Sequence, residues 1–299
     1  MKQNPFNLDD ASAYRRWRDY KLAHAITRTS ELIVEINDPR ALTPTEHAAL
    51  LDRCRRSNMA IYASRAKDID ENAVRELGKQ FGLNRLDANW LASEQGITHI
   101  AVSADDGLRQ AFIPYTNRAI KWHTDGYYNF PEQQVRSLLL HCVQSAAKGG
   151  ENRLIDHEIA YLMLRDADSE FIRALSAPDA MTIPERIDEH GIARAAQSGP
   201  VFSVDPASGE LQMRYTARTR SIAWKRDATT LAAVAMLEKL LASDSPHIHR
   251  ARLEGGMGLL CNNVLHDRAA FTDNADAPRL LFRARYLDRV ASPSLKLRA

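Results

Sequence analysis

Apolar residues recur at helical spacing in the first part of the chain, roughly residues 1–95. The stretch "TPTE" at 43–46 is typical of a helix start, with Thr43 as the N-cap and Glu46 as its capping-box partner. By contrast, "ELIVEIND" at 31–38 has the composition of a strand. We therefore expect a mostly helical N-terminal part that packs on whatever follows, with helices over residues 11–25, 43–56 and 70–81.

The pattern changes at about residue 97, where short apolar or alternating runs are separated by turn residues such as "DDG", "KGGEN" and "DPASG". This spacing is typical of an antiparallel β barrel or sandwich. The runs are "ITHIAVS", "QAFIPYT", "VRSLLLHCV", "GPVFSVD", "LQMRYTA", "MGLLCNNVL" and "RLLFRARYL". Helical segments over 156–177 and 229–242 interrupt them. No Pro- or Gly-rich linker divides the chain, so we predict a single domain over 1–299, mainly β with helical decoration.

The composition is that of an ordinary globular protein, with 44% hydrophobic and 26% charged residues and a net charge of +2. So small a charge, without a basic stripe interleaved with aromatics, argues against nucleic acid or an anionic membrane as a partner. No apolar run approaches the roughly 18 residues of a membrane span, and the N-terminus lacks an apolar signal core. Three cysteines without CxxC spacing favour a reducing compartment, so we expect a cytoplasmic protein.

Three candidate metal ligands stand where expected strands end. His123 and Asp125 lie two positions apart in "KWHTDGYYN", and alternate residues of an extended segment point to the same side. A later strand pattern, "LLCNNVLHDR", leads to His266. Two imidazoles and one carboxylate on one face of a β core would form the facial triad of non-haem Fe(II) oxygenases. A His-x-Asp pair alone arises often by chance, so this hypothesis depends on the three residues together.

Two arginines follow in "APRLLFRARY", and the even spacing of Arg279 and Arg283 puts both on one face of a strand. An arginine inside an apolar strand is costly unless it meets an anion. Its planar fork binds a carboxylate bidentately, and a 2-oxo acid that chelates a metal can carry such a carboxylate at its far end. The plainer alternative for either arginine alone is a surface position at the edge of the barrel.

The ordered set "WHTDG", "GGENRLID" and "NNVLHDR…RLLFRARY" resembles the taurine/2,4-D dioxygenase-like (TauD/TfdA) family of Fe(II)- and 2-oxoglutarate-dependent oxygenases. The resemblance covers about Ile97 to Tyr286. It implies a double-stranded β-helix (jelly-roll) core over 97–290, and it implies Fe(II), 2-oxoglutarate and O2 as the reacting set. It also implies that His123, Asp125 and His266 bind the iron and that Arg279 binds the distal carboxylate of 2-oxoglutarate.

The resemblance implies further roles for residues around these ligands. The family often has a "GGxT" turn whose hydroxyl contacts the same carboxylate, whereas this chain reads "GGEN", so Asn152 replaces threonine and its amide can donate. Arg283 falls where some members bind an anionic group of the substrate. Members that halogenate have a small residue in place of the carboxylate ligand, so Asp125 favours hydroxylation or a related hydrogen abstraction.

The substrate-binding residues follow from their position near the expected metal site. Tyr127, Tyr128 and Asn129 come directly after Asp125 and are expected to line the entrance. The stretch "LQMRYTARTRSIAW" adds arginines of one parity, of which Arg218 and Arg220 are candidates for binding a substrate anion. A solvated arginine face is the alternative. We expect a small-molecule substrate, anionic or similar to an amino acid, and whether the chain forms a homo-oligomer is left open.

Two other functions use the same fold. A cupin-like hydrolase or isomerase would use the three ligands to hold Zn²⁺ and activate water, and it would need no clamp for a 2-oxo acid. A non-catalytic binding protein would keep the barrel without the chemistry. Arg279 distinguishes the hydrolase from the oxygenase, and an intact ligand set disfavours the binding protein.

Overall fold

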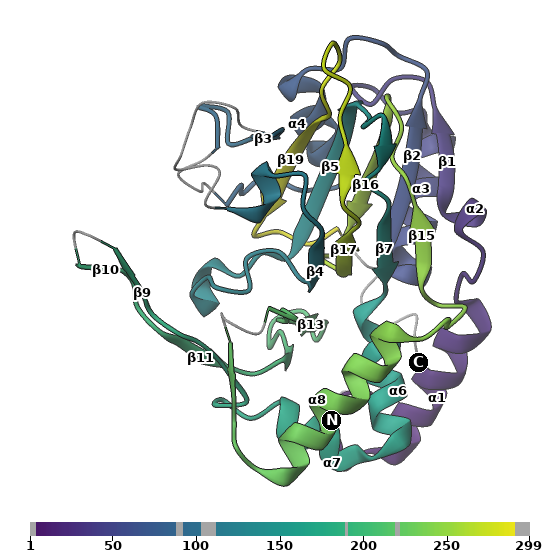
Figure 1. Cartoon of the computed structure of the whole chain (residues 1–299). Helices are drawn as coiled ribbons and strands as arrows, with labels where there is room; N and C mark the ends of the chain where they lie inside the picture. Colours follow the sequence, from purple (N-terminus) through teal and green to yellow (C-terminus); the bar gives the residue numbers. More distant parts are fainter. Residues whose placement is uncertain (1–3, 88–91, 103–111, 189–190, 219–221, 291–299) are drawn as a thin grey trace.

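Two β-sheets face each other at the centre of the computed structural model (Figure 1). The structure describes residues 4–87, 92–102, 112–188, 191–218 and 222–290. The six-stranded sheet is built, in spatial order, from β1 (Ile33–Ile36), β2 (Met59–Ser64), β16 (Met257–Cys261), β5 (Ser137–Gln144), β19 (Leu280–Tyr286) and β3 (Thr98–Ile100). The four-stranded sheet is built from β15 (His249–Ala251), β7 (Asn152–Ile155), β17 (Leu265–Arg268) and β4 (Ile120–His123). All of these neighbours pair antiparallel except β1 and β2.

The alternation along β5 assigns its side chains to two cores. Leu138, Leu140 and Cys142 point between the two sheets, where they join a buried cluster with Leu154 and Leu281. Leu139 points the other way, into a second cluster that packs under the N-terminal helices. Successive side chains of a strand point to opposite faces of the sheet, so β5 contributes to a core on each side. The space between the sheets is therefore apolar at one end, and the candidate ligands lie beside it.

Three N-terminal helices follow the expected boundaries: α1 (Ala11–His24), α3 (Pro44–Ser57) and α4 (Glu71–Gln80). The short α2 (Thr29–Leu32) was not expected, and it takes the first residues of the strand predicted over 31–38. The capping box at the start of α3 is present: the Glu46 backbone N–H donates to Thr43 Oγ1, and Glu46 Oε2 accepts from the Thr43 backbone N–H. Gly82 follows α4 with φ +77°, a conformation in which glycine has no steric cost.

The N-terminal part also contributes strands that the pattern did not predict in full. The stretch "MAIYAS" forms β2, whose first residues are buried without any polar alternation. Together β1 and β2 extend the six-stranded sheet beside β16, so this part of the chain is more than a helical cover. A short, continuous apolar run gives no period, and periodicity therefore could not assign it.

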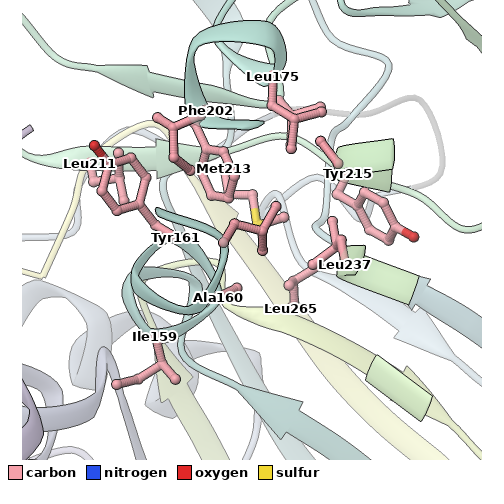
Figure 2. Close-up of a cluster of buried hydrophobic side chains, with 14 of the residues drawn as sticks. Ile159, Ala160, Tyr161, Leu175, Phe202, Leu211, Met213, Tyr215, Leu237 and Leu265 are labelled. Carbon is pink, nitrogen blue, oxygen red and sulfur yellow. The ribbon is translucent and has the colours of Figure 1, made fainter. Parts of the chain in front are cut away.

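A layer of helices closes the lower end of the sheets in Figure 1. It consists of α6 (His157–Ala167), α7 (Ser169–Leu175), α8 (Ala228–Ala242) and α1. The single helix expected over 156–177 is divided at Asp168, which ends α6 and caps α7 by accepting from the Glu170 N–H. Figure 2 shows the buried side chains that join this layer to the sheets, including Tyr161 of α6 and Leu237 of α8.

Short strands complete the fold. Two 3-10 turns, at Ile113–Tyr115 and Pro131–Gln133, flank β4, and the first stands where "QAFIPYT" predicts a strand. The paired strands β9 (Arg186–Asp188) and β10 (Gly191–Arg194) project from the body as an arm (Figure 1). The remaining strands are β6 (Lys148–Gly149), β8 (Met181–Ile183), β11 (Gln197–Gly199), β12 (Phe202–Val204), β13 (Leu211–Met213), β14 (Ala223–Trp224) and β18 (Phe271–Thr272). Within the described residues, no helix has the length and apolar character to cross a membrane.

A buried ion cluster fixes α1 to the helical layer and provides a test of this packing. Lys21 Nζ lies 2.5 Å from Asp156 Oδ2 and 2.5 Å from Glu158 Oε2, and all three side chains are buried. We predict that Lys21→Met lowers the free energy of unfolding by about 3–5 kcal/mol, because it leaves two buried carboxylates without their cation. Urea unfolding measures this effect.

The matched control is Lys79→Met, which removes an exposed pair with Glu76 on α4. This variant should unfold at almost the urea concentration of the unsubstituted protein. Equal stability of the Lys21 and Lys79 variants would show that the buried cluster does not hold the helix in place.

Candidate metal centre

The pairing of β4 with β17 brings the two candidate histidines together. His266 is the direct antiparallel partner of His123, and their ring centroids are 4.3 Å apart. Asp125 follows β4 at the same edge, and one ligand atom from each of the three residues lies within 4.8 Å of the others. Asp125 and His266 are buried, whereas the His123 side chain is 13% exposed. The structure thus assembles the three residues that the sequence predicted as a set.

Both imidazoles present the same nitrogen to the cluster. His123 Nδ1 lies 2.9 Å from the Lys121 carbonyl oxygen, and His266 Nδ1 lies 2.9 Å from the Val264 carbonyl oxygen. A carbonyl oxygen only accepts, so each Nδ1 carries a hydrogen and each Nε2 is left to face the cluster. Burial, and then the neighbouring His123, lower the pKa of His266 to about 4, so this imidazole is neutral near pH 7. Two imidazoles oriented in this way by backbone carbonyls fit a divalent metal.

Asp125 is held as a carboxylate by its surroundings. Burial alone would raise its pKa, but the guanidinium of Arg283, with smaller contributions from His123 and Arg285, holds the pKa well below its ordinary value. Arg283 Nη1 lies 3.3 Å from Asp125 Oδ2, and His123 Nε2 lies 3.6 Å from Asp125 Oδ1. The arginine expected at a substrate anion therefore contacts a candidate ligand, and its contact with substrate stays a prediction.

Asn263 fixes the backbone of Asp125, a role that the sequence did not suggest. Its Oδ1 accepts from the Asp125 N–H at 2.8 Å, and its Nδ2 donates to the carbonyl oxygens of Asp125 at 2.9 Å and Val135 at 2.7 Å. Asn263 is buried and has φ +49°, a left-handed conformation that asparagine tolerates better than most residues. It precedes His266 in "NNVLHDR", so one short segment positions two ligands.

Arg279 is buried beside this cluster, and its guanidinium forms no ion pair with the described residues. It is only 6% exposed, and none of its side-chain nitrogens has a hydrogen bond or ion pair within the described residues. Its guanidinium lies 4.9 Å from the centroid of the Phe271 ring, and a Cβ on Gly150 would lie 3.6 Å from its Nε. Burial lowers its pKa, whereas Cys142 and Asp273 raise it, and arginine stays charged near pH 7. A buried cation that no carboxylate contacts directly fits an anionic ligand, which an enclosed carboxylate would supply.

One small cavity joins Arg279 to the candidate ligands. Its polar lining comes from the three ligands, the two arginines that share a face, and the residues Asn152, Asp267 and Arg268. Ile100, Leu138 and Leu281 are among its apolar walls. Asn152 Nδ2 donates to the Asp267 carbonyl oxygen at 2.6 Å, so one of its amide hydrogens is already engaged. Its contact with 2-oxoglutarate stays a prediction.

Arg268 is a further cation near this cavity that sequence reasoning missed. It is buried and donates to the carbonyl oxygens of Pro114, Thr116 and Arg118. Burial, and then the neighbouring Arg279, lower its pKa to about 9. These contacts hold the segment that leads into β4, so Arg268 positions the strand that carries His123. The sequence could have indicated this position, because Arg268 lies two residues after His266 on β17 and alternate residues of a strand share a face.

The turn after Asp125 carries the expected entrance residues. Tyr127 is buried and Tyr128 half-buried, and their rings contact edge to face with centroids 5.2 Å apart. The side-chain amide of Asn129 is already hydrogen-bonded, because its Nδ2 donates to the Gln133 carbonyl oxygen and to Asp87 Oδ1. Arg218 reaches the Tyr127 hydroxyl, with Nη1 at 3.5 Å. Arg220 lies outside the described residues.

Another cavity, of about 850 Å³, lies on the opposite side of the four-stranded sheet. Trp122, Arg153 and Asp267 line it, and Arg153 already forms an ion pair with Asp267 at 2.6 Å. Its size exceeds that of the cavity at the candidate ligands, but it lacks their convergent imidazoles and carboxylate. Chemistry rather than volume therefore identifies the candidate site.

Comparison with known proteins agrees with this geometry. A family model described as "Taurine catabolism dioxygenase TauD, TfdA family" matches residues 19–285. Two relatives, from Amycolatopsis sp. and Streptomyces sp., are both named uridine-5'-phosphate dioxygenase. The first is 33% identical over 172 residues, 56% of this chain and 60% of the relative. The second is 29% identical over 189 residues, 60% of this chain and 66% of the relative. The match thus spans less than two thirds of either relative.

Solved structures of similar fold extend the comparison. An asparagine oxygenase superimposes with a TM-score of 0.60 at 14% identity, covering 83% of this chain and 81% of that chain. A taurine dioxygenase from Burkholderia xenovorans gives 0.57 at 18% identity, with coverages of 86% and 88%. The non-heme iron oxygenase OrfP, solved with Fe and alpha-ketoglutaric acid, gives 0.57 at 16% identity, with coverages of 81% and 82%. At such identities the likeness shows the fold, and it confirms the predicted jelly-roll core.

Asn263 provides a test of the candidate centre. We predict that Asn263→Ala weakens Fe(II) binding about 10- to 100-fold, because the Asp125 backbone loses the bonds that orient its carboxylate. Asn263→Gly should do the same, since it removes the bonds while accepting φ +49° without strain. Anaerobic equilibrium dialysis against Fe(II) measures both affinities.

Asn274→Ala serves as the control, because Asn274 is exposed and caps a distant turn. It should bind Fe(II) as the unsubstituted protein does. Unchanged affinity in both Asn263 variants would mean that this residue supports the fold and not the metal ligands.

Proposed function

Because this chain belongs to the taurine catabolism dioxygenase TauD/TfdA family, we propose that it is an Fe(II)- and 2-oxoglutarate-dependent dioxygenase. The observation that carries the proposal is the buried guanidinium of Arg279, which forms no hydrogen bond or ion pair with the described residues. It lies in one cavity with His123, Asp125 and His266. Three protein ligands would hold the iron on one face and leave positions open for a bidentate 2-oxo acid and O2. The donor set and the adjacent cation fit both groups.

The chain's own residues would bind and orient the reactants. His123, Asp125 and His266 hold Fe(II), and Arg279 binds the distal carboxylate of 2-oxoglutarate. Asn152 has one amide hydrogen left for the same carboxylate, and Arg283 keeps Asp125 ionised. Ile100, Leu138 and Leu281 exclude water from the cavity. When bound, Fe(II), 2-oxoglutarate and O2 supply oxidation of a substrate C–H bond, with succinate and CO2 as products.

The substrate that we propose is a small anion of the nucleoside 5'-phosphate class. The names of the two relatives support this class, as does the gathering of Tyr127, Tyr128 and Arg218 in and beside the turn after Asp125. Tyrosine rings can stack on a planar base, and guanidinium groups can bind a phosphate. Hydroxylation is the outcome that the carboxylate ligand Asp125 favours.

A metal-dependent hydrolase or isomerase on the same barrel is the competing function. It would use the three ligands to activate water, and Arg279 would have no partner to bind. An arginine kept buried without an anion costs free energy in such an enzyme, whereas a 2-oxo acid offsets that cost. The free-energy cost of burying Arg279 therefore favours the dioxygenase over the hydrolase, and substitution of Arg279 tests the choice between them.

We predict that Arg279→Ala raises the KM for 2-oxoglutarate about 100-fold in an assay of succinate formation with uridine 5'-phosphate. The variant loses a bidentate, charge-assisted contact with the distal carboxylate. Arg279→Lys should recover part of the loss, because its ammonium keeps the charge without the planar fork. Asp125→Ala should form no succinate, since the iron would lack its carboxylate ligand.

Arg250→Ala is the matched control, since this exposed arginine pairs with Asp244 on the opposite side of the sheet. It should leave the KM for 2-oxoglutarate unchanged. Metal-dependent turnover that needs no 2-oxoglutarate and survives Arg279→Ala would contradict the proposal and favour the hydrolase.

A further inference from the structure

The arm formed by β9 and β10 brings a cation to the tyrosines that follow Asp125. The guanidinium of Arg194, at the end of β10, lies 5.8 Å from the centroid of the Tyr128 ring. Its Nη2 donates to the Pro184 carbonyl oxygen at 2.7 Å, while its Nε is buried without a partner. Burial, and the neighbouring Arg186, lower the pKa of Arg194, whereas the two tyrosines raise it. Within the described residues, no carboxylate compensates this charge.

Arg218 brings a second cation to the same pair of tyrosines. Its Nη1 lies 3.5 Å from the Tyr127 hydroxyl, and the side chain is exposed. Across the described part of the chain it has no ion pair with an acidic residue. Because the two tyrosine rings contact each other, Arg194 and Arg218 border one aromatic surface, each against a different ring.

Two other arginines at this surface have several partners within the chain. Arg285 forms an ion pair with Asp87 at 2.5 Å and donates to the Tyr128 hydroxyl at 2.9 Å. Arg214 donates to three backbone carbonyl oxygens, those of Tyr127, Met181 and Gln197. These residues hold the turn and the strands in place. Within the part of the chain that the structure describes, Arg194 and Arg218 each have a single hydrogen bond from the side chain, so more of their N–H groups are available to a ligand.

We infer that Arg194 and Arg218 bind the phosphate monoester of the substrate, with Tyr127 and Tyr128 forming the surface between them. A phosphate monoester carries nearly two negative charges near pH 7 and offers three terminal oxygens. Two guanidinium groups can therefore bind one phosphate, whereas a carboxylate has only one charge and two oxygens to offer them. Arg279 and Arg283 are engaged deeper in the cavity, at the expected 2-oxoglutarate and at Asp125. The phosphate subsite would therefore lie beside the turn that follows Asp125, and Arg194 of the arm would supply one of its two cations.

The inference rests on the proposed function for the reaction, but the binding site can be tested by itself. Isothermal titration calorimetry of the full chain, loaded anaerobically with Fe(II) and 2-oxoglutarate, would compare uridine 5'-phosphate, uridine and inorganic phosphate. We expect the nucleotide to bind at least about 10-fold more tightly than the nucleoside, because charge-assisted hydrogen bonds contribute most of this difference. Inorganic phosphate should compete with the nucleotide.

Arg194→Ala and Arg218→Ala should each weaken nucleotide binding about 10- to 100-fold while leaving uridine binding unchanged. Arg218 is exposed, so its variant is expected to fold, and Arg194→Lys keeps a charge at the other position. The control is Arg173→Ala, an exposed arginine of α7 that pairs with Glu170. It should bind the nucleotide normally.

Equal binding of nucleotide and nucleoside would overturn the phosphate subsite, and so would undiminished nucleotide binding in both arginine variants. These results leave the dioxygenase proposal intact if succinate is still formed. Conversely, absence of succinate with a preserved preference for the nucleotide would refute the dioxygenase and retain the subsite. The two failures are therefore distinguishable.

Discussion

The antiparallel pairing of β4 with β17 is the constraint on which the candidate centre depends. It sets His266 opposite His123, and the turn that follows β4 returns Asp125 to the same edge. A shift of one residue in this register would move His266 to the outer face of the sheet, where Asp267 now pairs with Arg153. The backbone carbonyls of Lys121 and Val264 then set the tautomer of each ring. One strand pair thus fixes both the position and the ring orientation of the two histidine donors.

Several positively charged side chains are buried near the candidate metal ligands. Arg268, Arg279, Arg283 and Arg285 are clustered around the one candidate carboxylate ligand and its cavity. Three of these arginines have partners within the chain. Arg283 pairs with Asp125, Arg285 pairs with Asp87, and Arg268 donates to carbonyl oxygens. Among the described residues, the guanidinium of Arg279 has no hydrogen bond or ion pair, and Arg194 and Arg218 have no ion pair with a carboxylate. Arginines with several partners in the chain therefore support the fold, whereas those with few partners are available to anionic ligands.

The sequence indicated that His123, Asp125 and His266 would lie together, as they do, but it left parts of the surrounding scaffold unassigned. His123 ends β4 and Asp125 lies two residues beyond it, so both lie on the same side of the chain. His266 lies in β17 and Arg279 directly precedes β19, where strand alternation again indicates the side on which each residue lies. The capping box of α3 was equally local and is confirmed. In contrast, β2 has no polar alternation, and the short β9 and β10 carry weak patterns. Asn263, Arg194 and Arg285 act through partners distant in sequence, so no local spacing could indicate their contacts.

The most direct test of the central claim is an anaerobic titration of the metal-free protein with Fe(II) and then 2-oxoglutarate, followed by visible absorbance. If three residues hold the iron and leave adjacent positions open, 2-oxoglutarate chelates the metal and a weak charge-transfer band appears. The band should be absent in His266→Ala, which lacks one of the three donors. A protein that binds Fe(II) but shows no band on adding 2-oxoglutarate would contradict the account.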